Sequence, residues 1–158
     1  MKNRSLQKET ILLIVAHPDD ENFGMGGTIC HYKKLRYNIV GMYFTNGVGA
    51  RKDSRSKDLK REIIKRKNAS EKAAKLLGFK WVYRGNFKDN SMDDYPLITY
   101  IKEIEKVKEK FKPSIIYTHS PSDLNIDHRI VSSATMTAFR PEPGETFKEI
   151  SAFEVPSS

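Results

Sequence analysis

The sequence has little that could cross-link it or hold it in a membrane. It contains a single cysteine, Cys30, which excludes an internal disulfide and a zinc site built from several cysteines. No apolar run approaches the length of a membrane span. Residues 1–10 are too polar for the core of a signal peptide. We therefore expect a cytoplasmic protein without a membrane span.

The composition indicates one folded domain with a basic surface. The 158 residues are 38% hydrophobic and 30% charged, which suits a single domain with a real core. The formal net charge is +8, and many lysines fall on two polar helical faces, within residues 57–75 and 102–112. No nucleic-acid-binding motif accompanies them. We interpret the charge as a solvated surface and expect no nucleic-acid partner.

Short apolar runs alternate with helical patterns along the chain. Residues 10–16 form a continuous apolar run, which is typical of a strand buried on both faces. This alternation predicts an α/β fold, a Rossmann-like, mostly parallel sheet with helices on both faces. The further predicted strands are residues 38–44, 80–83, 114–118 and 147–155. The first predicted helix follows the glycine-containing stretch 23–28 and runs to about Arg36. Three further helices are predicted at residues 59–77, 97–111 and 127–138. The helix at 59–77 has Gly78 as its C-terminal cap, and its apolar face consists of Leu59, Ile63, Ala69, Ala73, Leu76 and Leu77.

Side chains that could bind a ligand or take part in catalysis follow the carboxyl ends of the predicted strands. Parallel sheets bind ligands beyond the carboxyl ends of their strands. His17 follows the first strand, Asn46 the second, Asp89 the third, and His119 and Asp123 the fourth. The sequence therefore predicts a site at this edge of the sheet.

Two motifs concentrate histidine and carboxylate at that edge. The first, residues 16–21, reads AHPDDE, and the second, residues 119–129, reads HSPSDLNIDHR. Acids that cap helices would explain the adjacent aspartates of the first motif, and a capping Asp127 would explain part of the second. Capping does not explain a histidine at the end of a strand, so we favour a site.

Together the motifs supply the ligands of a catalytic zinc ion. Zinc takes imidazole and carboxylate ligands, usually three from the protein. His17 and Asp20 lie three residues apart, and His128 is our choice for the third ligand; iron, cobalt or manganese would also suit this set. Asp19 is a free carboxylate beside the metal and can act as general base. Asp123 and Asp127 can fix the orientation of the histidines.

The two motifs resemble the signatures of the LmbE-like/PIG-L family. Residues 16–21 are similar to its first signature, and residues 123–131, DLNIDHRIV, to its second. Members of this family are metal-dependent deacetylases of N-acetylglucosamine derivatives with a Rossmann-like fold. The resemblance runs from about residue 10 to the end of the chain. It implies a zinc-dependent hydrolase that removes an acetyl group from an N-acetylated sugar or sugar conjugate.

The resemblance also implies roles for individual residues. Asn125 stands where several relatives have a histidine that steadies the transition state, and asparagine can donate a hydrogen bond there but cannot carry a proton. The implied zinc ligands are His17, Asp20 and His128; the implied catalytic residues are Asp19, Asp127 and Asn125; Arg66 and Asp89 match substrate contacts; and Asp123 matches a supporting acid.

Several alternatives remain at this point. Relatives continue beyond the position of Ser158, so we expect residues 1–158 to form a single deacetylase domain that lacks the C-terminal part of the family fold. A metal-binding but inactive protein, or a hydrolase of another amide, fits the same motifs. A nucleotide-binding loop at residues 24–27 is disfavoured by its glycine spacing. The oligomeric state is open, a homo-oligomer included.

Other residues are given ordinary roles, with one exception. His119 is as well suited to lining the site as to a structural role. We expect a surface position for His31, packing roles for Trp81 and Phe87, a buried position for Cys30, and a solvated loop position for Arg51, with an anionic ligand as its alternative.

Overall fold

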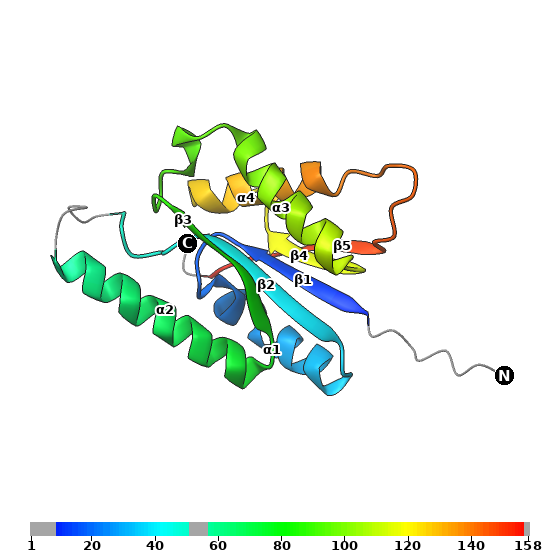
Figure 1. Ribbon diagram of the computed structural model, residues 1–158, viewed down its shortest axis with the longest axis horizontal. Coiled ribbons are helices and arrows are strands. Elements are labelled where there is room, and N and C mark those ends of the chain that lie inside the picture. Colours follow the sequence, from blue (N-terminus) through cyan, green and yellow to red (C-terminus); the bar gives the residue numbers. More distant parts are fainter. Residues whose placement is uncertain (1–8, 51–56, 157–158) are drawn as a thin grey trace.

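The computed structural model describes residues 9–50 and 57–156, which contain a five-stranded sheet in the order β3-β2-β1-β4-β5. All neighbouring strands in this sheet are parallel (Figure 1). The prediction of a Rossmann-like α/β fold is confirmed. The strands are β1 (Thr10–Val15), β2 (Asn38–Thr45), β3 (Lys80–Phe87), β4 (Ile115–His119) and β5 (Glu149–Phe153).

The helices cover the sheet on both faces (Figure 1). On one face lie α1 (Asp20–Lys34) and α2 (Lys57–Leu77). On the other lie α3 (Leu97–Phe111), which follows the short 3-10 helix η1 (Met92–Asp94), and α4 (Ile126–Ala138). The connections on the two sides of β1 run in opposite directions, so the strand order reverses there, which is where parallel sheets of this kind bind their ligands. Across the described residues, no helix combines the length and the apolar character needed to cross a bilayer.

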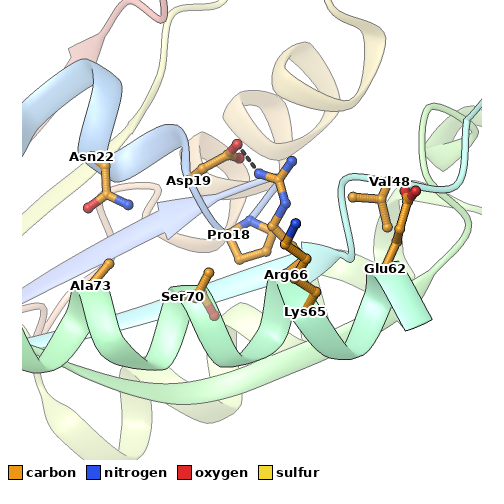
Figure 2. Close-up of a pocket in the computed structure, with 10 residues that line it drawn as sticks. Pro18, Asp19, Asn22, Val48, Glu62, Lys65, Arg66, Ser70 and Ala73 are labelled. Carbon is orange, nitrogen blue, oxygen red and sulfur yellow. Dashed lines mark hydrogen bonds and ion pairs between the residues drawn. The ribbon is translucent and has the colours of Figure 1, made fainter. Parts of the chain in front are cut away.

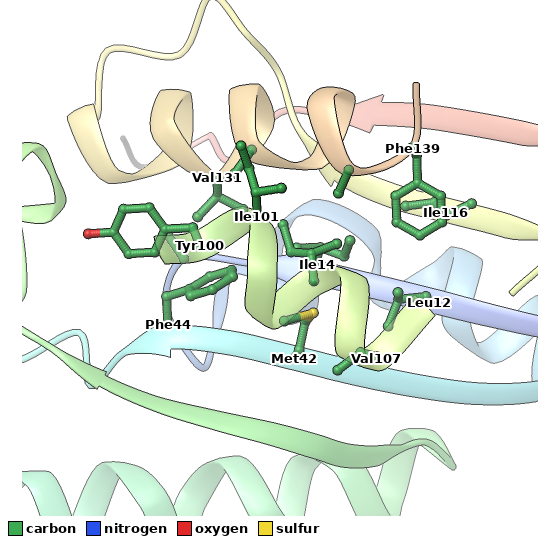
Figure 3. Packing of buried hydrophobic residues seen from close by; sticks show 14 of the residues in the cluster. Leu12, Ile14, Met42, Phe44, Tyr100, Ile101, Val107, Ile116, Val131 and Phe139 are labelled. Atoms are coloured by element: carbon green, nitrogen blue, oxygen red, sulfur yellow. The ribbon is translucent and has the colours of Figure 1, made fainter. Parts of the chain in front are cut away.

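The core has two halves that meet across the central strand β1. Leu12 and Ile14 face α3 and α4, where they pack with Tyr100, Ile101 and Val131 (Figure 3). The alternate β1 side chains, Ile11, Leu13 and Val15, face α1 and α2 in a second cluster. Burial of every β1 residue explains why its sequence is apolar without alternation.

Helix α1 begins earlier than the sequence predicts. The glycine-containing stretch 23–28, expected to precede the helix, lies inside it. Gly24 allows β5 to pack closely, because an ideal Cβ on it would lie 2.2 Å from Cδ2 of Phe153. The helix ends at Lys34, close to the predicted end.

Helix α2 buries the predicted face only in part, with Ile63, Ala73 and Leu77 half-buried. Leu59 is buried as expected, but Leu76 is 78% exposed and Ala69 is exposed. The buried positions further along are the small residues Ser70 and Ala74. Trp81 on β3 lies in the same buried cluster as Ala74, and its Nε1 donates to the Ser70 carbonyl, 3.3 Å away.

The ends of several elements also differ from prediction. Gly78 caps α2 in the left-handed conformation (φ 86°), as predicted, and its N–H donates to the Ala74 carbonyl at 2.8 Å. Strand β3 continues to Phe87, four residues further than expected, through two irregularities in its pairing with β2. Strand β5 is shorter than the run that predicted it.

Candidate metal centre

A histidine side chain connects the carboxyl ends of β1 and β4. Backbone pairing of these strands extends only to Leu13 and Tyr117. Three residues further on, the N–H of Ala16 donates to Nε2 of His119, at 2.9 Å. An imidazole therefore occupies the place of a strand carbonyl where the two strands separate. The next residue, His17, is buried at this end of the sheet.

Three predicted ligand residues meet at this end of the sheet. Nδ1 of His17 lies 3.2 Å from Nε2 of His128. Each of these nitrogens lies 3.4 Å from Oδ2 of Asp20. All three side chains are buried, with their potential ligand atoms grouped closely enough to hold one ion. The structure thus brings together the predicted set, although 111 positions separate the two histidines.

The ring nitrogens of His17 and His128 that point away from the three-residue group also meet carboxylates. Nδ1 of His128 lies 2.9 Å from Oδ2 of Asp123. Nε2 of His17 lies 3.1 Å from Oδ1 of Asp89 and 3.3 Å from Oδ2 of Asp127. Carboxylates accept hydrogen bonds, and the contacts of the outer nitrogens are shorter than the 3.4 Å contacts of the inner nitrogens with Asp20, which favours the ring proton on the outer nitrogen when a ring is neutral. In the neutral rings the inner nitrogens are then lone pairs, and with Asp20 they form a group of acceptors that fits a cation.

The electrostatics of the centre favour positive charge. Burial alone would lower the pKa of His17, but hydrogen bonds with Asp127, Asp20 and Asp89 raise it well above its usual value. The pKa of His128 is also raised, against the effect of burial, chiefly by Asp20. Burial would raise the pKa of Asp20, but hydrogen bonds from the surrounding histidines hold it well below its usual value. Two imidazoles and a carboxylate are a ligand set that suits zinc and related divalent metals.

Asp19 lies beside this group and faces a cavity. It is the N-cap residue of α1, but its side chain makes no capping hydrogen bond. Its carboxylate instead forms an ion pair with Arg66 of α2 (Figure 2). Both side chains line a cavity of about 400 Å³, together with Asn22 and Ser70. The helix-capping interpretation of the first motif therefore does not describe Asp19, whose carboxylate is accessible from the cavity.

Asn125, and not Asp127, caps helix α4. The side-chain oxygen of Asn125 accepts from the N–H of Asp127, at 2.9 Å. The carboxylate of Asp127 is fully buried and accepts from the backbone N–H groups of Asn90, at 2.7 Å, and Met92, at 3.1 Å. The capping alternative for Asp127 is therefore wrong, because its carboxylate turns back toward His17 and the loop after β3.

Two buried groups of the centre received no firm role from the sequence. His119 is fully buried and stacks on His128, with ring centroids 3.9 Å apart and planes 8° from parallel. Its Nε2 lies 2.9 Å from the Ala16 backbone nitrogen and 3.2 Å from Oδ2 of Asp20, and its Nδ1 has no hydrogen-bond partner among the described residues. Glu21 is also fully buried, and burial raises its pKa to about 8. In the sequence, only their positions within the two motifs indicated that His119 and Glu21 belong to the site.

The remaining residues singled out in the sequence lie away from the centre. His31 is exposed, as predicted. Trp81 and Phe87 pack in the two halves of the core, as predicted. Cys30 is half-buried in α1, so the prediction of a buried position is only partly right. Arg51 lies outside the described residues.

Comparison with known proteins gives a consistent result. A family model described as "PIG-L: GlcNAc-PI de-N-acetylase" matches residues 12–139, which include both motifs. The uncharacterized deacetylase YaiS of Escherichia coli K12 is 28% identical over 157 residues, an alignment that covers 96% of this chain and 77% of YaiS.

Solved structures share the fold. The N,N'-diacetylchitobiose deacetylase of Pyrococcus horikoshii superposes with a TM-score of 0.78 at 23% identity, over 93% of this chain and 61% of that one. The conserved protein TT1542 of Thermus thermophilus gives a TM-score of 0.70 at 21% identity, over 91% and 65%. The chain thus spans less than two thirds of these two structures. With the family model matched over most of its length, this chain belongs to the PIG-L family of deacetylases.

Proposed function

We propose that this protein is a metal-dependent deacetylase that hydrolyses the acetamide of a small N-acetylated sugar or sugar conjugate, in the cytoplasm. The observation that carries the proposal is the group of three ligand atoms from His17, Asp20 and His128, beside the accessible carboxylate of Asp19. The names of the relatives support the reaction type, because the family description, YaiS and the chitobiose enzyme all refer to deacetylation.

The three-residue group would hold the metal. Zinc is the proposed ion, and iron, cobalt or manganese would suit the same ligands. When bound, such an ion supplies a Lewis acid for the amide carbonyl and makes a neighbouring water more acidic. Asp123 and Asp127 would keep the outer ring protons in place, which sets the tautomers of His128 and His17.

Asp19 would carry the proton transfers. Its carboxylate accepts a proton from the attacking water and then delivers it to the nitrogen of the departing amine. Asn125 would donate its amide N–H to the developing oxyanion, a contact typically worth a few kcal/mol. Because asparagine cannot supply a proton, Asp19 is assigned both steps. Arg66, which lines the cavity next to Asp19, would contact the sugar.

The experiment that tests the proposal measures metal and product together. We expect about one zinc ion per purified chain and the release of acetate from at least one sugar in a panel of N-acetylated substrates. His128→Ala should lose both, and His31→Ala, at an exposed position on α1, should lose neither. Zinc without acetate release from any sugar or other amide would favour the inactive metal-binding alternative. Absence of metal after reconstitution would refute the proposal.

A further inference from the structure

His119, the last residue of β4, is a fully buried side chain to which the proposed mechanism gives no part. Its backbone is fixed within the sheet, because His119 pairs with Phe153 of β5. The next N–H along the chain, that of Ser120, donates to the Phe153 carbonyl at 2.9 Å. The His119 ring therefore starts from a rigid part of the fold, and its contacts show what it can hold in place.

The first contact joins His119 to the end of β1. Its Nε2 accepts from the N–H of Ala16, at 2.9 Å. On the side of β2, the carbonyl of Ala16 accepts from the N–H of Thr45, at 3.0 Å. Ala16 is thus held from both neighbouring strands, and the residue that follows it is the proposed ligand His17. The hydrogen bond to His119 therefore helps to fix the point at which His17 leaves β1.

The second contact fixes the plane of the His128 ring. The hydrogen bond between Nδ1 of His128 and Asp123, at 2.9 Å, holds one edge of this ring but leaves it able to tilt about that contact. The ring of His119 lies parallel to it, with the centroids 3.9 Å apart and 8° between the planes, and blocks a tilt toward itself. Together the two contacts direct Nε2 of His128 at Asp20 and His17.

A third contact reaches the remaining ligand residue. Oδ2 of Asp20 lies 3.2 Å from Nε2 of His119. One side chain thus touches two of the three proposed ligands, Asp20 and His128, and binds the residue that precedes the third, His17. The two histidine ligands are 111 positions apart in the chain, so their separation depends on tertiary contacts of this kind.

We infer that His119 is a positioning residue of the metal centre, which sets His17 and His128 relative to each other through the Ala16 hydrogen bond and the ring stack. The inference rests on the proposed function in that these two histidines are taken as metal ligands. A metal site requires ligands held close to the right geometry by side chains that are themselves fixed. His119 meets this requirement, because it belongs to a paired strand and its ring also contacts that of Phe153, with centroids 5.0 Å apart.

Two substitutions separate the two contacts. His119→Gln keeps an oxygen that can accept from Ala16 and loses the stacked ring, whereas His119→Phe keeps a flat ring and loses the acceptor. We expect zinc affinity, measured by competition with a chelator, to fall by about 10- to 100-fold in each variant. Co²⁺ suits the same ligands, and we expect the visible absorption bands of the cobalt-loaded variants to shift, since these bands report ligand geometry. Wild-type zinc affinity and a wild-type cobalt spectrum in either variant would overturn the inference.

Thr118, the neighbouring residue on β4, provides the matched control. It is buried, and its Oγ1 lies 3.2 Å from Oγ1 of Thr135 on α4. Thr118→Val removes this buried hydrogen bond and keeps the shape of the side chain, so it should lower the stability of the fold. Zinc affinity and the cobalt spectrum should stay unchanged. If Thr118→Val lost as much zinc affinity as the His119 variants, any weakening of β4 would disturb the centre, and the inference would be wrong.

Two NMR measurements on the metal-free wild-type protein need neither metal nor activity. The ring nitrogens of His119 should show the proton on Nδ1, because Nε2 accepts from Ala16. The ring protons of His119 and His128 should show a mutual nuclear Overhauser effect. If neither variant folded, a proton on Nε2 or a missing Overhauser effect would still overturn the inference. If the wild-type protein bound neither zinc nor cobalt, the proposed function would fail, whereas these signals would still decide whether His119 holds Ala16 and His128.

Discussion

Arg66 of helix α2 forms an ion pair with Asp19, across the cavity at the edge of the metal centre (Figure 2). The pair explains why Asp19 leaves the N-terminus of α1 uncapped by its side chain. It also joins α2, which has few buried residues, to the first motif. The cation thus keeps the proposed general base turned toward the cavity.

Asp19→Asn should remove turnover and keep the metal. The amide cannot accept the proton of the attacking water, so we expect kcat to fall by about 10²- to 10⁴-fold. Asp19 is not one of the three grouped ligand residues, so the zinc content should match that of the wild type. Both quantities are measured on the same preparation. Normal turnover would remove Asp19 from the mechanism.

Arg66→Gln should impair catalysis without unfolding the protein. The variant loses the ion pair with Asp19 and a charged group of the cavity. Hydrogen bonds to charged groups are worth about 1.5–3 kcal/mol, so kcat/KM should fall by about 10- to 150-fold. Lys72→Gln, an exposed position on the same helix, is the control and should behave as wild type. Equal kcat/KM for the two variants would contradict a role for Arg66.

Gly24→Ala should destabilise the fold through β5. The added Cβ would lie 2.2 Å from Cδ2 of Phe153 and 3.0 Å from the Glu154 carbonyl oxygen. Overpacking of this kind costs about 1–3 kcal/mol of unfolding free energy, measured by denaturant titration. Gly26→Ala is the matched variant in the same helix, since its Cβ would meet nothing within 4 Å. Because alanine has a higher helix propensity than glycine, Gly26→Ala should leave the unfolding free energy unchanged or raise it by up to about 1 kcal/mol. A Gly24→Ala protein as stable as wild type would show that β5 does not pack on α1 this closely.

Tyr100→Phe should reduce stability at neutral pH, with a smaller difference in alkali. The buried hydroxyl donates to the Met92 carbonyl at 2.7 Å, a bond worth about 0.5–1.5 kcal/mol. Burial, followed by the charge of Asp127, raises the pKa of Tyr100. Above about pH 10 the unfolded phenol ionises while the folded one stays neutral, so the wild type loses stability as pH rises. Tyr100→Phe has no phenol at this position, so it does not lose stability in this way. Denaturation at pH 7 and above pH 10 measures the gap, and a gap that widened would contradict the raised pKa.

The predicted architecture and the place of the site were read from local patterns. The continuous apolar run of β1 indicated a buried strand, and the two motifs at strand ends indicated a site at that edge of the sheet. The buried face of α2 was predicted only in part. Leu76 is exposed, whereas Ser70 and Ala74 are buried near Trp81, because periodicity along a helix does not include the side chains that a neighbouring strand presents.

The sequence alone determined the family, the sheet and the residue types of the metal centre, since strand periodicity and short motifs are encoded by neighbouring residues. Only the tertiary structure decided which nitrogen of His17 faces Asp20 and that Asp89 turns inward. It likewise decided that Asn125 caps α4 while Asp127 reaches back to the loop after β3. These choices depend on atoms of segments far apart in the chain, and their distances are fixed only when the strands and helices pack.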